Sequence, residues 1–150
     1  MQTTDDVQLR AASPADCDQV ATLLKRCGLP SDDTEQIIEA FHVALDKGGR
    51  IVGCVAAEPL GKSIVVRSAA VDALYRDRGI ASRLIETLLV RARGTGAHEA
   101  YLLSTAAPAY FARWGFSLFP ADKAPPAVRG STTFRHAERT SALCMRCELR

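Results

Sequence analysis

The stretch Val71–Leu84, which reads VDALYRDRGIASRL, decides the fold because it joins a buried strand to the most regular helix of the chain. Residues 64–71 (IVVRSAAV) lead into it and are almost all apolar or small, which predicts a strand buried on both faces. From Ile80 to Leu89 apolar residues recur at helical spacing, so we predict an amphipathic helix that begins near Gly79 and ends near Gly94. A strand that turns tightly into a helix is therefore the centre of the predicted fold.

The sequence on both sides of this centre predicts further strands and helices. Short apolar or alternating runs that are bounded by turn residues are typical of strands. The predicted strands lie at residues 7–10, 41–45, 50–58, 62–71, 98–103, 116–119 and 141–149. The strand after the long helix returns by a crossover, so it is expected to run parallel to the strand before that helix. Shorter helices are expected after Ser13, after Ser31 and at 108–114, and a proline-rich, irregular segment with room for one helical turn at 120–130. This order predicts an α+β fold. We expect a mixed central sheet of six to seven strands and about four helices.

The composition predicts one ordinary globular domain over residues 1–150. Hydrophobic residues make up 47% of the 150 residues and charged residues 24%. The net charge of +2, without a basic run, argues against a nucleic-acid partner, and no apolar stretch is long enough to cross a membrane. Because no signal-peptide pattern opens the chain and the five cysteines are odd in number, we expect reduced thiols in a cytoplasmic protein. The spacing Cys144-x-x-Cys147 lies in a strand pattern without a second ligand pair, so no metal site is predicted.

The turn Arg76–Ala81 carries the chemistry that the sequence predicts. A helix begins there, and the first turn of a helix exposes unpaired amide groups with partial positive charge. Gly79 permits close approach of the backbone, while Arg76 and Arg78 supply positive charge, so the turn could surround a diphosphate. The chain has neither GxxxxGK[ST] nor GxGxxG after a strand, which excludes the common nucleotide loops. The alternative interpretation is an ordinary helix start with two surface arginines.

These residues resemble a known family. The pattern Arg76-x-x-Gly79-x-Ala81, preceded by Ala70-Val71, is similar to the coenzyme A signature of the GCN5-related N-acetyltransferase (GNAT) superfamily. Residues 110–116 (YFARWGF) resemble the second motif of that superfamily. Residues 66–71, 102–107 and 141–145 resemble the small acetyltransferases associated with arsenic-resistance operons, and the first two of these stretches also resemble the acetyltransferase domain of N-acetylglutamate synthases.

The resemblance implies a GNAT fold and acetyl-CoA as the acetyl donor, with no metal. It implies that two central strands splay apart into a cleft, and that an amine attacks the acetyl group directly, without a covalent enzyme intermediate. A main-chain N–H at the strand end would stabilise the developing oxyanion. The cofactor-binding residues that it implies are Ala69, Ala70, Val71, Arg76, Asp77, Arg78, Gly79, Ile80, Ala81 and Ser82.

Proton transfer is less easily assigned, because Phe111 occupies the place where many family members have a tyrosine that acts as general acid. The tyrosine stands one residue earlier, at Tyr110, and a shift of one residue turns a helical side chain by about 100°. Tyr110 and Ser104 are the candidate donors, with Thr105 beside Ser104 and water as a further possibility. Glu58 is the candidate base, because it is expected at a strand end; the alternative is a solvated turn residue.

Arg67 suggests what the acceptor carries. An arginine inside a buried strand needs a partner, and it could bind a carboxylate or oxyanion of the substrate, or pair with Glu58. We expect Thr105 and Arg129 to contribute to the same substrate site. The leading hypothesis is an N-acetyltransferase for a small anionic amine, either an amino acid or an arsenic-containing analogue. The alternatives are a peptide or protein N-acetyltransferase and a non-catalytic acetyl-CoA binder. Exposed sheet edges are compatible with a homodimer.

Overall fold

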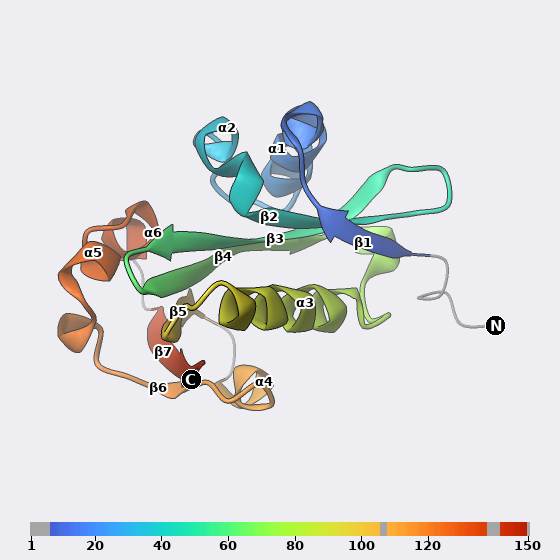
Figure 1. Cartoon of the computed structure of the whole chain (residues 1–150). Coiled ribbons are helices and arrows are strands. Elements are labelled where there is room, and N and C mark those ends of the chain that lie inside the picture. Colours follow the sequence, from blue (N-terminus) through green and yellow to red (C-terminus); the bar gives the residue numbers. More distant parts are fainter. Residues whose placement is uncertain (1–6, 106–107, 138–141, 150) are drawn as a thin grey trace. The chain divides into compact units, whose positions relative to one another are not determined.

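The computed structural model describes residues 7–105, 108–137 and 142–149, and in them seven strands form one mixed sheet. The strands are labelled in Figure 1. The strands pair in the order β1-β2-β3-β4-β5-β7-β6. Their bounds are β1 Gln8–Ala11, β2 Phe41–Leu45, β3 Ile51–Leu60, β4 Ser63–Val71, β5 Glu99–Ser104, β6 Ser117–Leu118 and β7 Leu143–Glu148. The helices are α1 Cys17–Arg26, α2 Thr34–Ile37, α3 Ile80–Gly94, α4 Pro108–Ala112, α5 Pro126–Arg129 and α6 Thr132–Ala137. The pair β4–β5 is parallel, as the crossover predicts, whereas β1–β2, β2–β3, β5–β7 and β6–β7 are antiparallel.

The predicted α+β fold is confirmed, with two local differences. The helical turn that residues 120–130 were expected to allow is α5, which has proline in its first turn. A further helix, α6, follows where none was predicted; the side-chain oxygen of Ser131 accepts the Phe134 N–H at 3.3 Å at its start. With α5 and α6, the described residues contain six α-helices where about four were predicted. In addition, β3 continues through Pro59, which the sequence interpretation had placed in a turn.

The strands and helices group into two compact units, and we describe each by itself. The first unit contains residues 1–57 and 68–88. In it, α1 and α2 lie on one face of β2 and β3, and the first turns of α3 lie on the other face (Figure 1). Leu23 and Leu24 of α1 pack with Phe41 and Val43 of β2 in its core. The unit brings the end of β4 and the start of α3 together.

On the other face, the contact between β3 and α3 depends on a glycine. A Cβ atom on Gly53 would lie 3.1 Å from a methyl group of Ile80 and 3.3 Å from one of Leu84. Both distances are shorter than an ordinary contact between carbon atoms. The missing side chain therefore allows the first turn of α3 to lie directly on β3.

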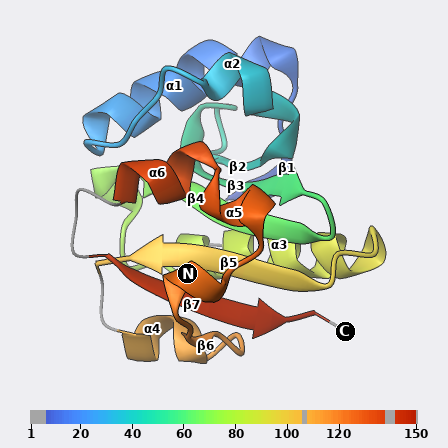
Figure 2. The same cartoon turned by 90° about the vertical axis from the view of Figure 1, so that its left-hand side faces the viewer.

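The second unit contains residues 58–67 and 89–150. Its core includes Tyr101 of β5, Val128 of α5 and Phe134 of α6. Figure 2 shows α5 and α6 beside β5, and α4 with β6 beside β7. Gly115, with a φ of 93°, makes the turn between α4 and β6. The single domain over residues 1–150 stays a prediction.

Among the described residues, no helix combines the length and the apolar character that a membrane span requires. None of the five cysteines forms a disulfide. Burial raises the pKa of the Cys144 thiol to about 11, and this side chain packs in the core of the second unit. Cys144 is therefore a small buried core residue.

Candidate active site

The last part of β4 has an irregular backbone. Ser68 has a φ of 56°, a left-handed conformation that non-glycine residues rarely adopt. Its carbonyl oxygen accepts the Cys54 thiol at 3.5 Å. The parallel ladder between β4 and β5 covers Ser63–Val65 with Glu99–Tyr101, although β4 itself continues to Val71. The main chain after Ser68, where acetyl-CoA-binding groups were predicted, therefore lies beyond that ladder.

The predicted phosphate loop contains two further left-handed residues. Asp77 has a φ of 63° and Gly79 a φ of 79°, and α3 begins at Ile80. A Cβ on Gly79 would meet nothing within 4 Å, so the glycine is needed for its backbone angle and leaves open space beside the loop. The side chain of Ile80 is buried and anchors the helix start. Turns that mix left- and right-handed residues can point several N–H groups at one anion.

A cavity of about 70 Å³ lies beside the end of β4 and the first turns of α3. It is lined by residues of β3, β4 and α3 that are almost all apolar: Cys54, Val55, Ala69, Ala70, Val71, Ala81, Leu84 and Ile85. Four of the predicted cofactor-binding residues (Ala69, Ala70, Val71 and Ala81) therefore line one cavity.

The two loop arginines contact groups of the protein itself. The Nε of Arg76 donates to the Val71 carbonyl at 3.1 Å, and one Nη lies 3.7 Å from the sulfur of Cys27. The guanidinium of Arg78 lies over the ring of Tyr75, 5.0 Å from its centre. Both arginine residues are exposed, so their charge is held at the surface of the loop. Cys27 had not been placed near this loop by sequence reasoning, because it lies 49 residues before Arg76.

In the second unit, Arg67 and Glu58 form an ion pair. The Arg67 side chain is only 6% exposed and that of Glu58 is 19% exposed; the closest nitrogen and oxygen are 3.4 Å apart. This is one of the two partners that the sequence allowed for Arg67. Glu58 was expected at a strand end but lies within β3, which continues to Leu60. Proline is tolerated where its missing N–H is not needed by the sheet, and the exposed Pro59 continues this strand.

The other predicted catalytic and substrate residues also belong to the second unit. Ser104 ends β5 and pairs with Leu143 of β7, and the exposed Thr105 follows it. Tyr110 lies on α4, where its ring packs edge-on against Trp114 at 5.3 Å and under the guanidinium of Arg113 at 4.7 Å.

Tyr110 and Phe111 belong to one cluster of aromatic rings at α4. The rings of Tyr110 and Phe111 are perpendicular, with centres 5.0 Å apart, and Phe111 also contacts Phe116 at 6.3 Å. The two rings thus contact each other, and each also contacts Trp114.

Arg129 ends α5 and donates from Nε to the Ala124 carbonyl at 3.0 Å. It belongs to a helical turn of the proline-rich segment. Among residues 7–105, 108–137 and 142–149, no three His, Cys, Asp or Glu side chains gather as metal ligands would.

Comparison with known proteins identifies the family. Residues 38–118, more than half of the chain, match the model of the acetyltransferase (GNAT) domain. The chain belongs to this family. Its residues 38–118 therefore form an acetyltransferase (GNAT) domain. A search of curated proteins gave no match.

Solved structures share the fold. The N-acetylglutamate synthase of Neisseria gonorrhoeae, in complex with coenzyme A and N-acetyl-glutamate, is 24% identical with a TM-score of 0.82. The match covers 96% of this chain but 35% of that enzyme, so the chain spans about a third of its length. Rv2747 of Mycobacterium tuberculosis, also in complex with CoA, is 22% identical with a TM-score of 0.81, and 95% and 99% of the two chains are covered. YhbS of Escherichia coli in complex with CoA is 23% identical with a TM-score of 0.70; 97% of this chain and 82% of that chain are covered.

Proposed function

We propose that this enzyme acetylates the amine of a small acceptor that carries a carboxylate or a similar anion. The observation that carries the proposal is the buried guanidinium of Arg67, which has a half-buried carboxylate at 3.4 Å. A guanidinium can bind two oxygens of a planar anion side by side. A contact of 3.4 Å to one oxygen is long for a charge-assisted hydrogen bond, so a substrate anion could bind Arg67 more closely than Glu58 does.

The residues of the first unit fit the acetyl donor. We assign the diphosphate to the N–H groups of the loop from Arg76 to Ser82, because two left-handed residues and a helix start lie there. The apolar cavity of about 70 Å³ fits a narrow aliphatic chain such as part of the pantetheine arm. Acetyl-CoA, when bound, supplies a thioester whose carbonyl carbon accepts the amine.

Main-chain groups of Ala69, Ala70 and Val71 are suited to the thioester end of the donor. They follow the left-handed Ser68, and they lie past the ladder that joins β4 to β5. We assign the stabilisation of the oxyanion to an N–H group of this segment, because a fixed backbone dipole needs no reorientation as charge develops. Arg67 lies two residues before Ala69 in the same strand.

Glu58 is proposed to accept the proton that the attacking amine loses. It pairs with Arg67, so an anion that binds Arg67 brings its amine near the carboxylate. Ser104 and Tyr110 stay candidate donors to the leaving thiolate, and Thr105 and Arg129 stay candidate contacts of the acceptor. The N-acetyl-glutamate bound to the Neisseria gonorrhoeae enzyme supports an amino-acid acceptor, while the arsenic-containing analogue rests on the sequence resemblance.

Release of free thiol from acetyl-CoA tests the proposal with a panel of neutral, cationic and anionic amines, which includes amino acids and an arsenic-containing amino-acid analogue. We expect turnover with anionic amines and little with the others. R67M should raise the KM of the anionic acceptor at least tenfold, whereas the KM of acetyl-CoA should stay within about twofold. R67K keeps the positive charge but loses the paired nitrogens of the guanidinium, so its acceptor KM should lie between those of wild type and R67M.

A matched pair in the same unit provides the control. Arg146 lies 3.7 Å from Glu99, and both side chains are about one quarter exposed. R146M and E99Q should leave the KM of the acceptor unchanged, whereas E58Q should lower kcat and alter its dependence on pH. Equal turnover of neutral and anionic amines, or an R67M variant with the wild-type acceptor KM, would refute the anionic acceptor. Tight CoA binding without thiol release for any amine would favour a non-catalytic binder, and turnover of peptides alone would favour a protein N-acetyltransferase.

A further inference from the structure

Asp72, the residue that follows β4, uses all of its polar groups to fix the chain. Its N–H donates to the Val52 carbonyl at 2.8 Å, and its carbonyl accepts the Tyr75 N–H at 2.8 Å. One carboxylate oxygen, Oδ1, accepts the Leu74 N–H at 3.0 Å and so caps the short helical turn Ala73–Tyr75. Asp72 is 6% exposed, so these bonds are shielded from water.

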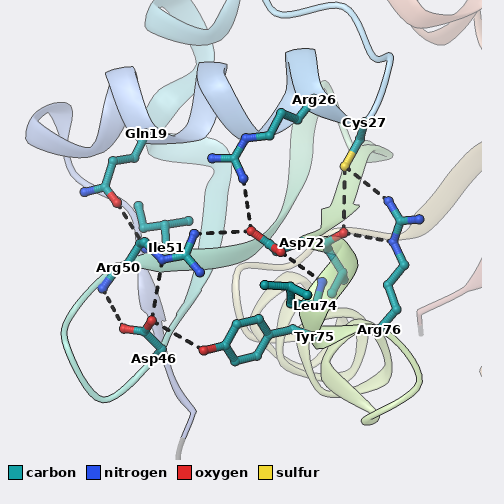
Figure 3. A network of polar contacts seen from close by, with 11 residues as sticks. Gln19, Arg26, Cys27, Asp46, Arg50, Ile51, Asp72, Leu74, Tyr75 and Arg76 are labelled. Carbon is teal, nitrogen blue, oxygen red and sulfur yellow. Dashed lines mark hydrogen bonds and ion pairs between the residues drawn. The ribbon is translucent and has the colours of Figure 1, made fainter.

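The second carboxylate oxygen of Asp72 joins two other parts of the first unit (Figure 3). It accepts Nη1 of Arg26, at the end of α1, at 3.1 Å and Nη1 of Arg50, just before β3, at 3.2 Å. The side chains of these arginines are 58% and 46% exposed, whereas that of Asp72 is 7% exposed. Arg50 is itself held by Asp46 at 3.6 Å. Two exposed arginine side chains thus share one buried carboxylate.

Asp72 stands at the start of the segment 72–79, which leads from β4 to α3. Among residues 72–79, which the structure describes completely, Asp72 is the buried one, and most of the others are exposed. The same segment contains the left-handed Asp77, a backbone conformation that costs about 1–3 kcal/mol unless its surroundings hold it in place. The buried Ile80 holds one end of this segment and Asp72 holds the other. Between them, Arg76 donates to the Val71 carbonyl.

We infer that Asp72 is a positioning residue for the acetyl-donor site: through Arg26 and Arg50 it fixes the turn that presents the loop N–H groups to the diphosphate. The inference rests on the proposed role of the Arg76–Ser82 loop. Asp72 itself contacts no part of the donor, and it acts by holding the backbone that follows it. The Leu74 N–H and the Arg50 guanidinium both lower the pKa of Asp72, so the carboxylate is ionised at neutral pH.

The direction in which the Kd of CoA changes in D72N distinguishes a positioning role from a purely electrostatic effect. Coenzyme A is a polyanion. If only charge mattered, removal of the negative charge of Asp72 would relieve Coulomb repulsion and strengthen CoA binding. A positioning role predicts the opposite, because D72N leaves the two arginines without their shared acceptor and loosens the turn. The amide oxygen that D72N introduces can still accept the Leu74 N–H, so this variant removes the charge and keeps the cap.

Isothermal titration of CoA into wild type, D72N and D16N is the test. Asp16 is a matched control in the same unit: it is 5% exposed, it is bound by an arginine that is 46% exposed, and it lies in another part of the chain. We expect the Kd of CoA to rise about tenfold in D72N, which corresponds to about 1.4 kcal/mol. D16N should stay within about twofold of wild type. A Kd for D72N that equals or falls below that of wild type would overturn the inference.

A second set of variants decides the question if D72N does not fold. R26Q and R50Q change exposed side chains, and each should raise the Kd of CoA more than R10Q, which removes a cation of similar exposure from the Asp16 pair. A double variant of Arg26 and Arg50 that binds CoA as tightly as R10Q does would overturn the inference. Where D72N folds, adding R50Q to it should change the Kd less than R50Q does in the wild-type background, because the two act as one unit. If wild type itself does not bind CoA, the assignment of the loop has failed; if wild type binds and D72N binds equally, only the role of Asp72 has failed.

Discussion

The ion pair between Asp16 and Arg10 should make the stability of this protein fall in acid by a defined amount. Arg10 of β1 donates two hydrogen bonds to the Asp16 carboxylate, at 2.7 and 3.0 Å, and the Ser13 N–H donates a third at 2.8 Å. The hydrogen bonds from Arg10, the largest cause, lower the pKa of Asp16 from 3.8 to about 2. The pair ties β1 to the start of α1.

The lowered pKa of Asp16 fixes both the direction and the size of the change in unfolding free energy with pH. The folded state holds the ionised carboxylate better than the unfolded state does, so the contribution is complete above about pH 5 and is lost as the pH falls toward 2. A lowering from 3.8 to about 2 corresponds to about 2 kcal/mol of unfolding free energy at pH 7, and to roughly 1 kcal/mol at pH 3. In a chain of this length, about 2 kcal/mol lowers the melting temperature by roughly 4–8 °C.

Urea unfolding of wild type and D16N at pH 7, 5 and 3, followed by circular dichroism, measures the effect. D16N should be less stable by about 2 kcal/mol at pH 7, and the gap should shrink as the pH falls, because protonation removes the same charge from wild type. Asp18, an exposed residue in the first turn of α1, provides the control, and D18N should cost under about 1 kcal/mol. A gap that is unchanged between pH 7 and 3, or absent at pH 7, would refute the reasoning.

Three further predictions concern the first unit. G79A should cost about 1–2 kcal/mol of stability through its left-handed backbone alone, and it should also raise the Kd of CoA in titration. G53A should cost about 1–3 kcal/mol in urea unfolding, because its methyl group would lie 3.1 Å from a methyl of Ile80; equal or greater stability than wild type would contradict this packing. Burial raises the pKa of the Cys54 thiol to about 12, so a thiol reagent at pH 8 should modify Cys54 only after urea unfolds the protein, and rapid modification of the native state would contradict its burial.

The acetyl-donor loop could be predicted from the sequence because its signals are local. Gly79, the small residues of β4 and the helical spacing after Ile80 all lie within about 25 consecutive residues, and each has a direct conformational meaning. Asp72 lies in the same stretch, directly after the small residues of β4. Its partners could not be found, because Arg26 and Arg50 lie 46 and 22 residues before it, and charged residues that far apart carry no pairing signal.

Short helices and proline positions were harder to predict for a different physical reason. Helix α6 has six residues, too few for a repeating apolar stripe, and its burial depends on Phe134. Glu58 was placed at the end of its strand because the next residue is a proline, which usually marks a turn. Whether a proline ends a strand depends on its neighbours in the sheet, and these are set by the tertiary fold.

The left-handed Ser68 has a consequence for how such an enzyme can change. The boundary between the two compact units crosses β4 between Arg67 and Ser68, at the place where the regular strand conformation is interrupted. The proposed acceptor residue, Arg67, and the proposed donor segment, Ala69–Val71, thus belong to different units although they are close neighbours in the chain. Mutations that alter acceptor preference can accumulate on one side of Ser68 while the donor residues stay constant. A lineage of such proteins could therefore diversify in what it acetylates without losing its acetyl source.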